Sequence, residues 1–220
     1  MKKEVLSELI DLLYEFDTNY EGVINYNLSD FLGFLNSKVD KDNISMRKIE
    51  GNEQSHIESI RQESESDITI LITLMFRYAK GYIKKALLDS NIQTADEFAF
   101  LITLMTHQSL TKTELINKQI MEKTSGIEVI KRLIGQNMIS EFADEEDKRS
   151  VRVAITPKGK NELIKVLPEM AKVSKIVVGN LSKTEILSLS YLLKKLDFFH
   201  NEIFMNKKSL NLDQLLQSDL

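Results

Sequence analysis

The sequence has no cysteine, only two prolines and eight glycines among its 220 residues. The absence of cysteine excludes disulfides, thiolate zinc sites, cysteine nucleophiles and thiol-based redox sensing. The three histidines, His56, His107 and His200, lie far apart, and none has a partner at metal-ligand spacing. No nucleophile–base pair or glycine-rich phosphate loop is present either. We therefore predict that the protein is not an enzyme and needs no metal or other cofactor.

Long apolar runs are also missing. The longest, "ILITLMF" from Ile70, is far shorter than the roughly 18 residues that a membrane span requires. The opening "MKKEVLSELIDLLYEF" scatters acids through the part where a signal peptide would be apolar. We expect a cytoplasmic protein without a membrane partner.

The composition is that of a globular protein, with 42% apolar and 28% charged residues, and the charge is distributed unevenly. Residues 1–70 hold 7 bases and 15 acids, whereas the remaining 150 residues hold 22 bases and 18 acids. The net charge of −4 thus combines an acidic arm with a basic body. A local basic patch on that body is compatible with nucleic-acid binding.

A serine or threonine followed three residues later by glutamate marks four expected helix starts, because each side chain can cap a backbone N–H near the other. The pairs are Thr94/Glu97, Thr111/Glu114, Ser125/Glu128 and Ser182/Glu185. Together with the apolar periodicity they predict helices over 68–89, 95–107, 112–121, 126–136, 157–181 and 183–204. The first half of 68–89 is apolar around most of its circumference, so we expect it to be buried on more than one side.

Further residues mark where these helices bend or end. Asn137 tolerates the left-handed conformation that ends a helix, Pro168 is expected to bend helix 157–181, and Gly179 with Asn180 ends it. Ahead of these elements, amphipathic helices are predicted near 2–16 and 28–39, followed by a polar connector or solvated helix up to residue 67.

Two short alternating segments, 139–143 and 151–156, predict a β-hairpin whose turn is "DEEDKRS". Residues 108–156 therefore read as helix, turn, helix and hairpin. The predicted fold class is mainly α, a winged helix-turn-helix with a two-stranded β-wing and long flanking helices. In this architecture the second helix enters the major groove of DNA.

The candidate DNA-binding residues lie on that second helix and on the wing. On the helix, the polar face and its start carry Lys123, Thr124, Ser125, Lys131, Arg132 and Gln136. We expect Glu128 to act as the capping partner of Ser125 rather than as a base reader. The alternative interpretation is the ordinary solvated face of a surface helix.

On the wing, Arg149 is placed to enter the narrow minor groove, where negative potential concentrates. Lys148 and Arg152 are placed for phosphates, and Ser150 completes the candidate set. Asp147 is positioned to brace the guanidinium of Arg149 in a bidentate pair. The acidic cluster from Asp144 to Asp147 should repel DNA, so an ordinary solvated turn remains the alternative interpretation.

The segment "DKRSVRVAITPKG" resembles the wing pattern of the MarR (multiple antibiotic resistance regulator) family through Asp147, Arg149, Ser150, Thr156 and Gly159. The resemblance covers about residues 68–204. It implies a symmetric dimer formed by terminal helices, a pseudopalindromic DNA operator and frequent release by small aromatic or anionic effectors. Glu128, Gly126 and Asn137 depart from the family's usual residues, and the absence of cysteine excludes the peroxide-sensing mode of part of the family.

We therefore expect a homodimeric regulator, most readily a repressor, that binds double-stranded DNA. The expected divisions are an acidic extension (1–66), the regulator (67–204, with its winged core at 94–160 and dimerisation helices 68–89 and 157–204) and a tail (205–220). An effector cavity lined by Tyr78, Tyr82, Phe98 and His107 is one hypothesis, and ordinary core packing of these side chains is the other. The alternative function is a winged-helix module that binds protein without DNA.

Overall fold

The computed structural model describes residues 3–19, 28–39, 56–145, 147 and 149–217. Contacts divide the chain into two compact units, Met1–Ser59 and Ile60–Leu220, which are described separately below. Within the described residues, none of the helices combines the length and the apolar character that crossing a bilayer demands.

The first unit contains a helical hairpin of α1 (Lys3–Asn19) and α2 (Leu28–Val39), which agrees with the two predicted amphipathic helices. The hairpin is held by a cluster of phenylalanines. The ring of Phe16 lies 5.3 Å from that of Phe31 and 5.4 Å from that of Phe34, measured between centroids. These distances and the tilted orientations are those of favourable aromatic pairs.

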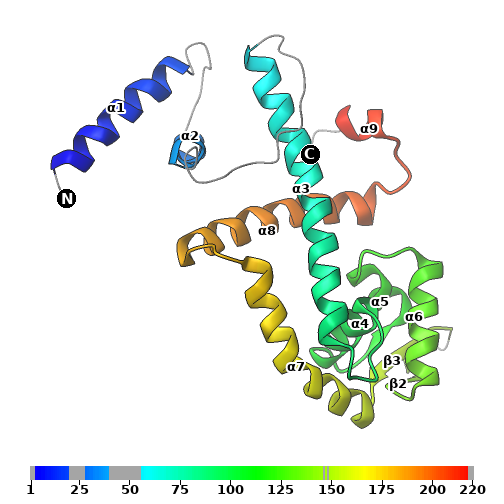
Figure 1. Cartoon of the computed structure of the whole chain (residues 1–220). Helices are drawn as coiled ribbons and strands as arrows, with labels where there is room; N and C mark the ends of the chain where they lie inside the picture. The colour runs from blue at the N-terminus through cyan, green and yellow to red at the C-terminus, as the bar shows by residue number, and fades with distance from the viewer. Residues whose placement is uncertain (1–2, 20–27, 40–55, 146, 148, 218–220) are drawn as a thin grey trace. The chain divides into compact units, whose positions relative to one another are not determined.

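The second unit begins within the long helix α3 (His56–Ala86) and carries a compact winged core, which Figure 1 shows in green. The core contains α4 (Ala95–Met105), β1 (Leu110–Thr111), α5 (Lys112–Lys118), α6 (Lys123–Gly135), β2 (Ile139–Ala143) and β3 (Val151–Ile155). It is followed by α7 (Pro157–Val178), α8 (Lys183–Asn206) and α9 (Leu212–Gln217). Pro168 lies inside α7 without ending it, and Gly179 caps its end with a φ of 58°.

The sheet has three antiparallel strands in the order β1-β3-β2. The predicted hairpin is present, with Ile139 opposite Ile155 and Ala143 opposite Val151. The short strand β1 was not predicted. It pairs Leu110 with Val153 and so attaches the segment before α5 to the wing.

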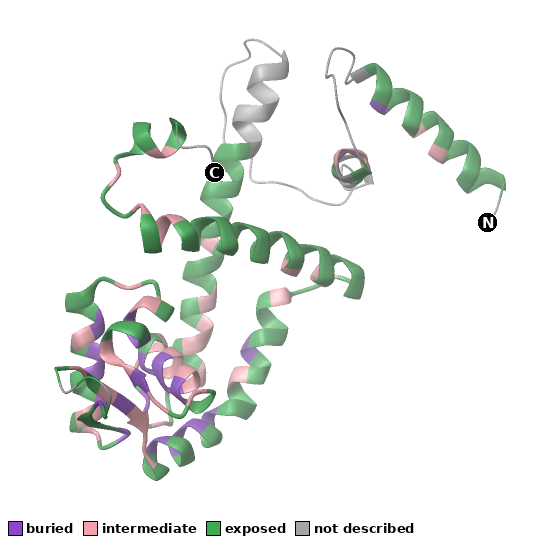
Figure 2. Ribbon diagram, turned by 180° about the vertical axis from the view of Figure 1, so that it is seen from behind, coloured by how far each residue is buried: buried purple, intermediate pink, exposed green. Residues whose placement is uncertain are grey.

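The hydrophobic core lies among α4, α5, α6, the sheet and the first half of α7, where Figure 2 shows most of the buried residues. Phe100, Leu115, Leu133 and Val153 are fully buried there. The expectation that the first half of helix 68–89 is buried on several sides is wrong for a single chain, because Ile68, Ile72 and Phe76 stand exposed. None of the residues of α8 is buried.

Two of the four predicted capping boxes are complete, at Thr111/Glu114 and Ser182/Glu185. Thr94 caps α4 through its side chain, but the carboxylate of Glu97 accepts from the N–H of Gln93 at 2.7 Å instead of completing a box. The Ser125/Glu128 box is wrong. Helix α6 begins earlier, with Glu122 at the N-cap and no side-chain hydrogen bond there, so Ser125 lies within the first turn.

The end of α6 follows the prediction for Asn137, which has a left-handed φ of 57°. The N–H of Asn137 donates to the carbonyl of Ile134 at 2.8 Å, and the N–H of Met138 donates to that of Leu133 at 2.9 Å. This pair of bonds is a Schellman motif, and Leu133 and Met138, both fully buried, supply its usual apolar contact.

The carbonyl of Met138 then fixes the start of α7. It accepts the N–H of Thr156 at 3.0 Å. The hydroxyl of Thr156 caps α7 by accepting from the N–H of Gly159 at 3.0 Å, and it donates to the carbonyl of Asn137 at 2.8 Å. A Cβ on Gly159 would lie 2.1 Å from the oxygen of Met138. Thr156 and Gly159 of the wing pattern are thus explained by how α7 joins the sheet.

We expect Gly159→Ala to lower the free energy of unfolding by about 3 kcal/mol, because the clash is with a hydrogen-bonded backbone oxygen that has nowhere to move. Gly135→Ala is the matched control, since a Cβ there meets nothing within 4 Å. That change should raise stability by up to about 1 kcal/mol, as alanine favours helix. Urea unfolding of both variants measures the difference, and equal stabilities would contradict this account of the junction.

Candidate nucleic-acid interface

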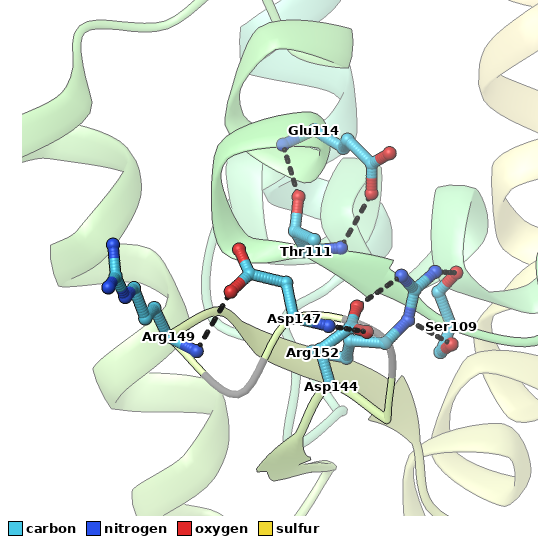
Figure 3. Close-up of polar contacts among 7 residues, drawn as sticks. All are labelled: Ser109, Thr111, Glu114, Asp144, Asp147, Arg149 and Arg152. Carbon is cyan, nitrogen blue, oxygen red and sulfur yellow. Dashed lines mark hydrogen bonds and ion pairs between the residues drawn. The ribbon is translucent and has the colours of Figure 1, made fainter.

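The helix-turn-helix is built from α5 and α6. At the start of α5 the N–H of Thr111 donates to the carboxylate of Glu114 at 2.7 Å (Figure 3). This bond and a second one with the Thr111 side chain lower the pKa of Glu114 below its ordinary value. Because the folded-state pKa is depressed, the stabilisation is present above the ordinary carboxyl pKa and is lost as pH falls through the lowered value.

The turn between α5 and α6 is tight. Ile120 adopts a left-handed φ of 53°, which is uncommon for a β-branched residue. Its N–H donates to the carbonyl of Asn117 and that of Met121 donates to Ile116, so Ile120 occupies the position where helices usually end in glycine. Gly126 lets α6 approach α5 closely, since a Cβ there would lie 2.5 Å from the Ile116 side chain. This packing explains why the sequence has glycine at a position where the resembling family usually has a larger residue.

Gly126, Val129, Ile130 and Leu133 form the buried face of α6. At 100° per residue, Thr124, Glu128 and Lys131 lie on the opposite face, with Ser125 beside them, and all four are exposed. Lys123 is exposed in the first turn. The predicted polar face is therefore present on the outer side of the helix. Glu128 does not cap α6, so the reason from the sequence for excluding it as a base-reading residue no longer holds.

Two other candidates on α6 are occupied within the fold. The Nε of Arg132 donates to the carboxylate of Glu97 at 3.0 Å, and Glu97 is fully buried in α4. The Arg132 side chain is still 42% exposed, so its outer nitrogens remain near solvent. Gln136 ends the helix, and its side-chain oxygen is buried with no hydrogen-bond partner among the described residues. Gln136 is thus placed inward, against the expectation from the sequence.

The wing is anchored by an arginine that had been assigned to phosphate. Arg152 donates from Nη1 to the carboxylate of Asp144 at 2.8 Å, from Nε to the hydroxyl of Ser109 at 2.8 Å, and from Nη2 to the Ser109 carbonyl at 3.0 Å (Figure 3). All of its guanidinium nitrogens are therefore engaged internally. The prediction that Arg152 contacts DNA is corrected, since Asp144 and Ser109 form a clamp around it.

Asp144 also shapes the turn of the wing. Its other carboxylate oxygen accepts the N–H of Asp147 at 3.2 Å, and its own N–H donates to the carbonyl of Ser150 at 3.0 Å. This carboxylate is nearly buried and faces the Arg152 guanidinium, so part of the acidic cluster that argued against DNA binding is neutralised inside the wing. Ser150 is partly buried and donates its N–H to the carbonyl of Asp147 at 2.8 Å.

Arg149 lies at the tip of the wing and is exposed. Asp147 accepts the backbone N–H of Arg149 at 3.0 Å, so it braces the main chain and not the guanidinium as expected. Figure 3 shows the Arg149 side chain directed away from the clamp around Arg152. Lys148, the remaining candidate on the wing, lies outside the described residues.

The four residues of the predicted effector cavity are spread over two helices and a loop. Tyr78 and Tyr82 are one turn apart on α3, and Tyr78 is 45% exposed. Phe98 packs against the hydrophobic core, whereas the ring of His107 lies 2.8 Å from the carbonyl of Thr103 at the far end of α4. The effector cavity stays a prediction.

Comparison with protein families gives a match over residues 94–159 to the family described as "Winged helix DNA-binding domain". Residues 94–159 are similar to the members of this family. The match spans α4 to the start of α7, and thus both α6 and the wing. No curated protein matches the sequence.

Solved structures extend the similarity beyond this domain. A MarR transcriptional regulator from Methanosarcina mazei is 22% identical with a TM-score of 0.58, and the similarity covers 63% of this chain and 99% of that one. BpsR of Bordetella bronchiseptica, whose DNA binding is regulated by 6-hydroxynicotinic acid, is 21% identical with a TM-score of 0.56 over 60% and 98% of the two chains. A mutant of E. coli MarR, complexed with operator DNA, is 22% identical with a TM-score of 0.53 over 64% and 99%.

These structures confirm the MarR-like winged-helix fold that the sequence resemblance implied. They are nearly complete chains, whereas about three fifths of this chain is covered by the similarity. The proteins named are DNA-binding regulators, in agreement with the prediction that the chain is not an enzyme.

We expect Asp144→Asn to lower the free energy of unfolding by about 2 kcal/mol, because the partly buried Arg152 loses its carboxylate partner. Hydrogen exchange should also accelerate at the N–H groups of Asp147 and Ser150, which depend on the turn. Glu145→Gln removes a charge from the neighbouring exposed position and should change stability by less than about 0.5 kcal/mol. Equal behaviour of the two variants would show that the clamp does not hold the wing.

Proposed function

We propose that the protein is a transcriptional regulator that binds a pseudopalindromic DNA operator as a homodimer, in the cytoplasm. The observation that carries this proposal is the joint exposure of two cationic elements of the winged domain. Lys131 stands on the outer side of α6, Lys123 is exposed in its first turn, and Arg149 stands at the tip of the wing. A winged helix uses these two elements to contact the major and the minor groove.

The start of α6 supports a phosphate contact. The helix has no side-chain cap, so its first backbone N–H groups are left for an outside acceptor. A helix N-terminus with free N–H groups and positive dipole favours phosphate. Lys123, Thr124 and Ser125 lie in this first turn, and we assign them to the DNA backbone.

The exposed apolar helices support a dimer. On α8, Tyr191, Leu192 and Phe198 face solvent, with Phe198 77% exposed, and α3 exposes Ile68, Ile72 and Phe76. Many exposed large apolar side chains on two helices are typical of an interface. A twofold axis through it would place two recognition helices about 34 to 36 Å apart, the distance between successive major-groove faces.

We propose that Glu128 contributes to sequence specificity. It lies between Thr124 and Lys131 on the outer face of α6, where base edges would be met. A carboxylate there accepts a hydrogen bond from the amino group of cytosine in the major groove. The same carboxylate repels phosphates. It therefore favours the position of α6 in the major groove at which Glu128 faces a base and not the DNA backbone.

We further propose that a small aromatic or anionic molecule regulates DNA binding, so that its binding releases the protein from a repressed promoter. It is supported by the similar fold of BpsR, whose DNA binding responds to 6-hydroxynicotinic acid. A ligand that binds one dimer geometry better by about 1 to 3 kcal/mol would change operator occupancy severalfold or more.

Arg149→Ala is expected to weaken operator binding about tenfold or more while leaving thermal stability unchanged, because the side chain is exposed and contributes only to DNA. Lys175→Ala, which removes one exposed charge from α7, is the control and should bind as the parent does. Fluorescence anisotropy over a range of salt concentrations, with DNA selected from a random pool, measures both. An unchanged affinity of the Arg149 variant would refute the wing assignment. Absence of binding even at low salt would favour a protein-binding module instead.

Glu128→Gln is expected to change base preference at one position of each half-site from cytosine towards adenine, because an amide pairs with adenine and a carboxylate with cytosine. Affinities for operators substituted one base pair at a time give the measurement. Preference at the affected position should change by about 1 to 3 kcal/mol, with Glu145→Gln as the charge-matched control. A uniform rise in affinity for all operators would mean that Glu128 acts only through its charge.

A further inference from the structure

An ion pair joins the segment after α8 to the start of α6, the helix that we propose for the major groove. The Nζ of Lys208, two residues beyond Asn206 at the end of α8, lies 3.0 Å from a carboxylate oxygen of Glu122. Glu122 is the N-cap residue of α6, and its side chain makes no capping hydrogen bond. The carboxylate therefore binds the C-terminal segment instead of capping its own helix.

Lys208 is held in this position by its own segment. Its ammonium lies 4.7 Å from the centroid of the Phe204 ring, one helical turn earlier, which is the distance of a favourable cation–π contact. The N–H of Lys207 donates to the carbonyl of Ile203 at 2.9 Å, and the N–H of Leu210 donates to the carbonyl of Lys207 at 3.0 Å. A hydrogen-bonded turn thus carries the ammonium to the start of α6.

Glu122 would oppose the proposed DNA contact if it had no cationic partner. It directly precedes the first turn of α6, which we assign above to the DNA backbone, and its side chain is 73% exposed. A carboxylate beside phosphates is repulsive, because like charges at close range disfavour each other. The ammonium of Lys208 neutralises this negative charge at the place where phosphate would approach.

The same ammonium has hydrogen-bond donors left for a second acceptor. A lysine carries three N–H groups, and the Lys208 side chain is 50% exposed beside Glu122. Exposed ion pairs contribute little to stability, so the ammonium can shift towards a phosphate without disturbing the fold. Phosphate is the acceptor that DNA brings to this end of α6, since a recognition helix contacts DNA through its N-terminal residues.

We propose that Lys208 is a DNA-binding residue, which donates to a backbone phosphate at the start of α6 while it neutralises Glu122. The DNA interface then includes the segment after α8, outside residues 94–159 that match the winged helix family. The inference rests on the proposed function, because its ligand is the same operator DNA.

The test is the affinity of the full-length protein for selected operator DNA, measured by fluorescence anisotropy over a range of salt concentrations. Lys208→Gln should weaken binding about three- to tenfold and lower the salt slope by about 0.9, the value for one phosphate contact. Lys208→Arg keeps the charge and should retain both values. Parent-like affinity and slope in Lys208→Gln overturn the proposal.

Lys172→Gln is the matched control, because it removes a lysine from another exposed ion pair, the one with Glu169 on α7. It should bind DNA as the parent does. Both glutamine variants should also melt at the temperature of the parent, since neither pair is buried. An equal loss of affinity in the two variants would mean that any lost positive charge has this effect, and it overturns the proposal.

A double-mutant cycle separates a phosphate contact from simple neutralisation of Glu122. Glu122→Gln should strengthen binding, because a negative charge near the phosphates is removed. Adding Lys208→Gln to that variant should still weaken binding and lower the salt slope, since the phosphate contact is still lost. If Lys208→Gln has no effect in the Glu122→Gln background, the lysine only neutralises the acid, and the proposal is overturned.

Arg149→Ala provides the reference that separates this inference from the proposed function. Weaker binding in Arg149→Ala together with parent-like binding in Lys208→Gln overturns the Lys208 contact and leaves the proposed function intact. Absence of DNA binding by the parent protein, even at low salt, refutes the proposed function and the Lys208 contact with it.

Photo-cross-linking tests the proximity of this residue to DNA directly. Because the sequence has no cysteine, a single introduced thiol is unique and carries an aryl azide at one position. Lys208→Cys should cross-link to operator DNA, as Lys123→Cys should, whereas Lys172→Cys should not. Cross-linking at Lys123→Cys without cross-linking at Lys208→Cys contradicts the proposed contact.

Discussion

The peptide backbone of Met138 joins the elements on which the winged domain depends. Its N–H closes the end of α6 on Leu133, and its carbonyl receives Thr156 at the start of α7. Gly159 packs against the same carbonyl at a distance that admits no side chain. The orientation of α6 relative to the sheet and to α7 is therefore set by one buried residue. A change at this junction would alter α6, the wing and α7 together, and α7 leads towards the proposed dimer interface.

Much of this architecture could be predicted from local signals. The capping boxes at Thr111 and Ser182, the left-handed Asn137 and the alternating strand from Val151 each depend on neighbouring residues only. The failures have a different origin. Ser125 and Glu128 have the spacing of a cap, but packing of Gly126 on Ile116 places them inside a helix that starts earlier. The sequence predicts a DNA contact for Arg152 because its hydrogen-bond partner Ser109 lies 43 residues away, too far for a local pattern to reveal the contact. Strand β1, two residues long, has no pattern of its own.

The distribution of charge explains how a chain with a net charge of −4 can carry the cationic surface that we propose for DNA. Asp144 and Glu97 are acids of the winged domain, yet each is buried against an arginine, Arg152 and Arg132. Their negative charge is compensated inside the fold, whereas Lys123, Lys131 and Arg149 stay at the surface. The exposed acids of α1, Glu4, Glu8, Asp11 and Glu15, belong to the N-terminal unit. Arg132 and Arg152 bind acids within the fold, whereas Arg149 is proposed to contact the minor groove. Only the partners of these arginines in the structure distinguish the two roles.

The central claim is that two copies of the winged domain read DNA around a twofold axis. Hydroxyl-radical footprinting on a site selected from random DNA tests it most directly. The account predicts an inverted repeat with two protected half-sites whose centres lie one helical turn, about 10 to 10.5 base pairs, or a multiple of it apart. It also predicts protection of the minor groove next to each half-site, where Arg149 would lie. A single unsymmetrical footprint, or no selection of a common sequence, would contradict it.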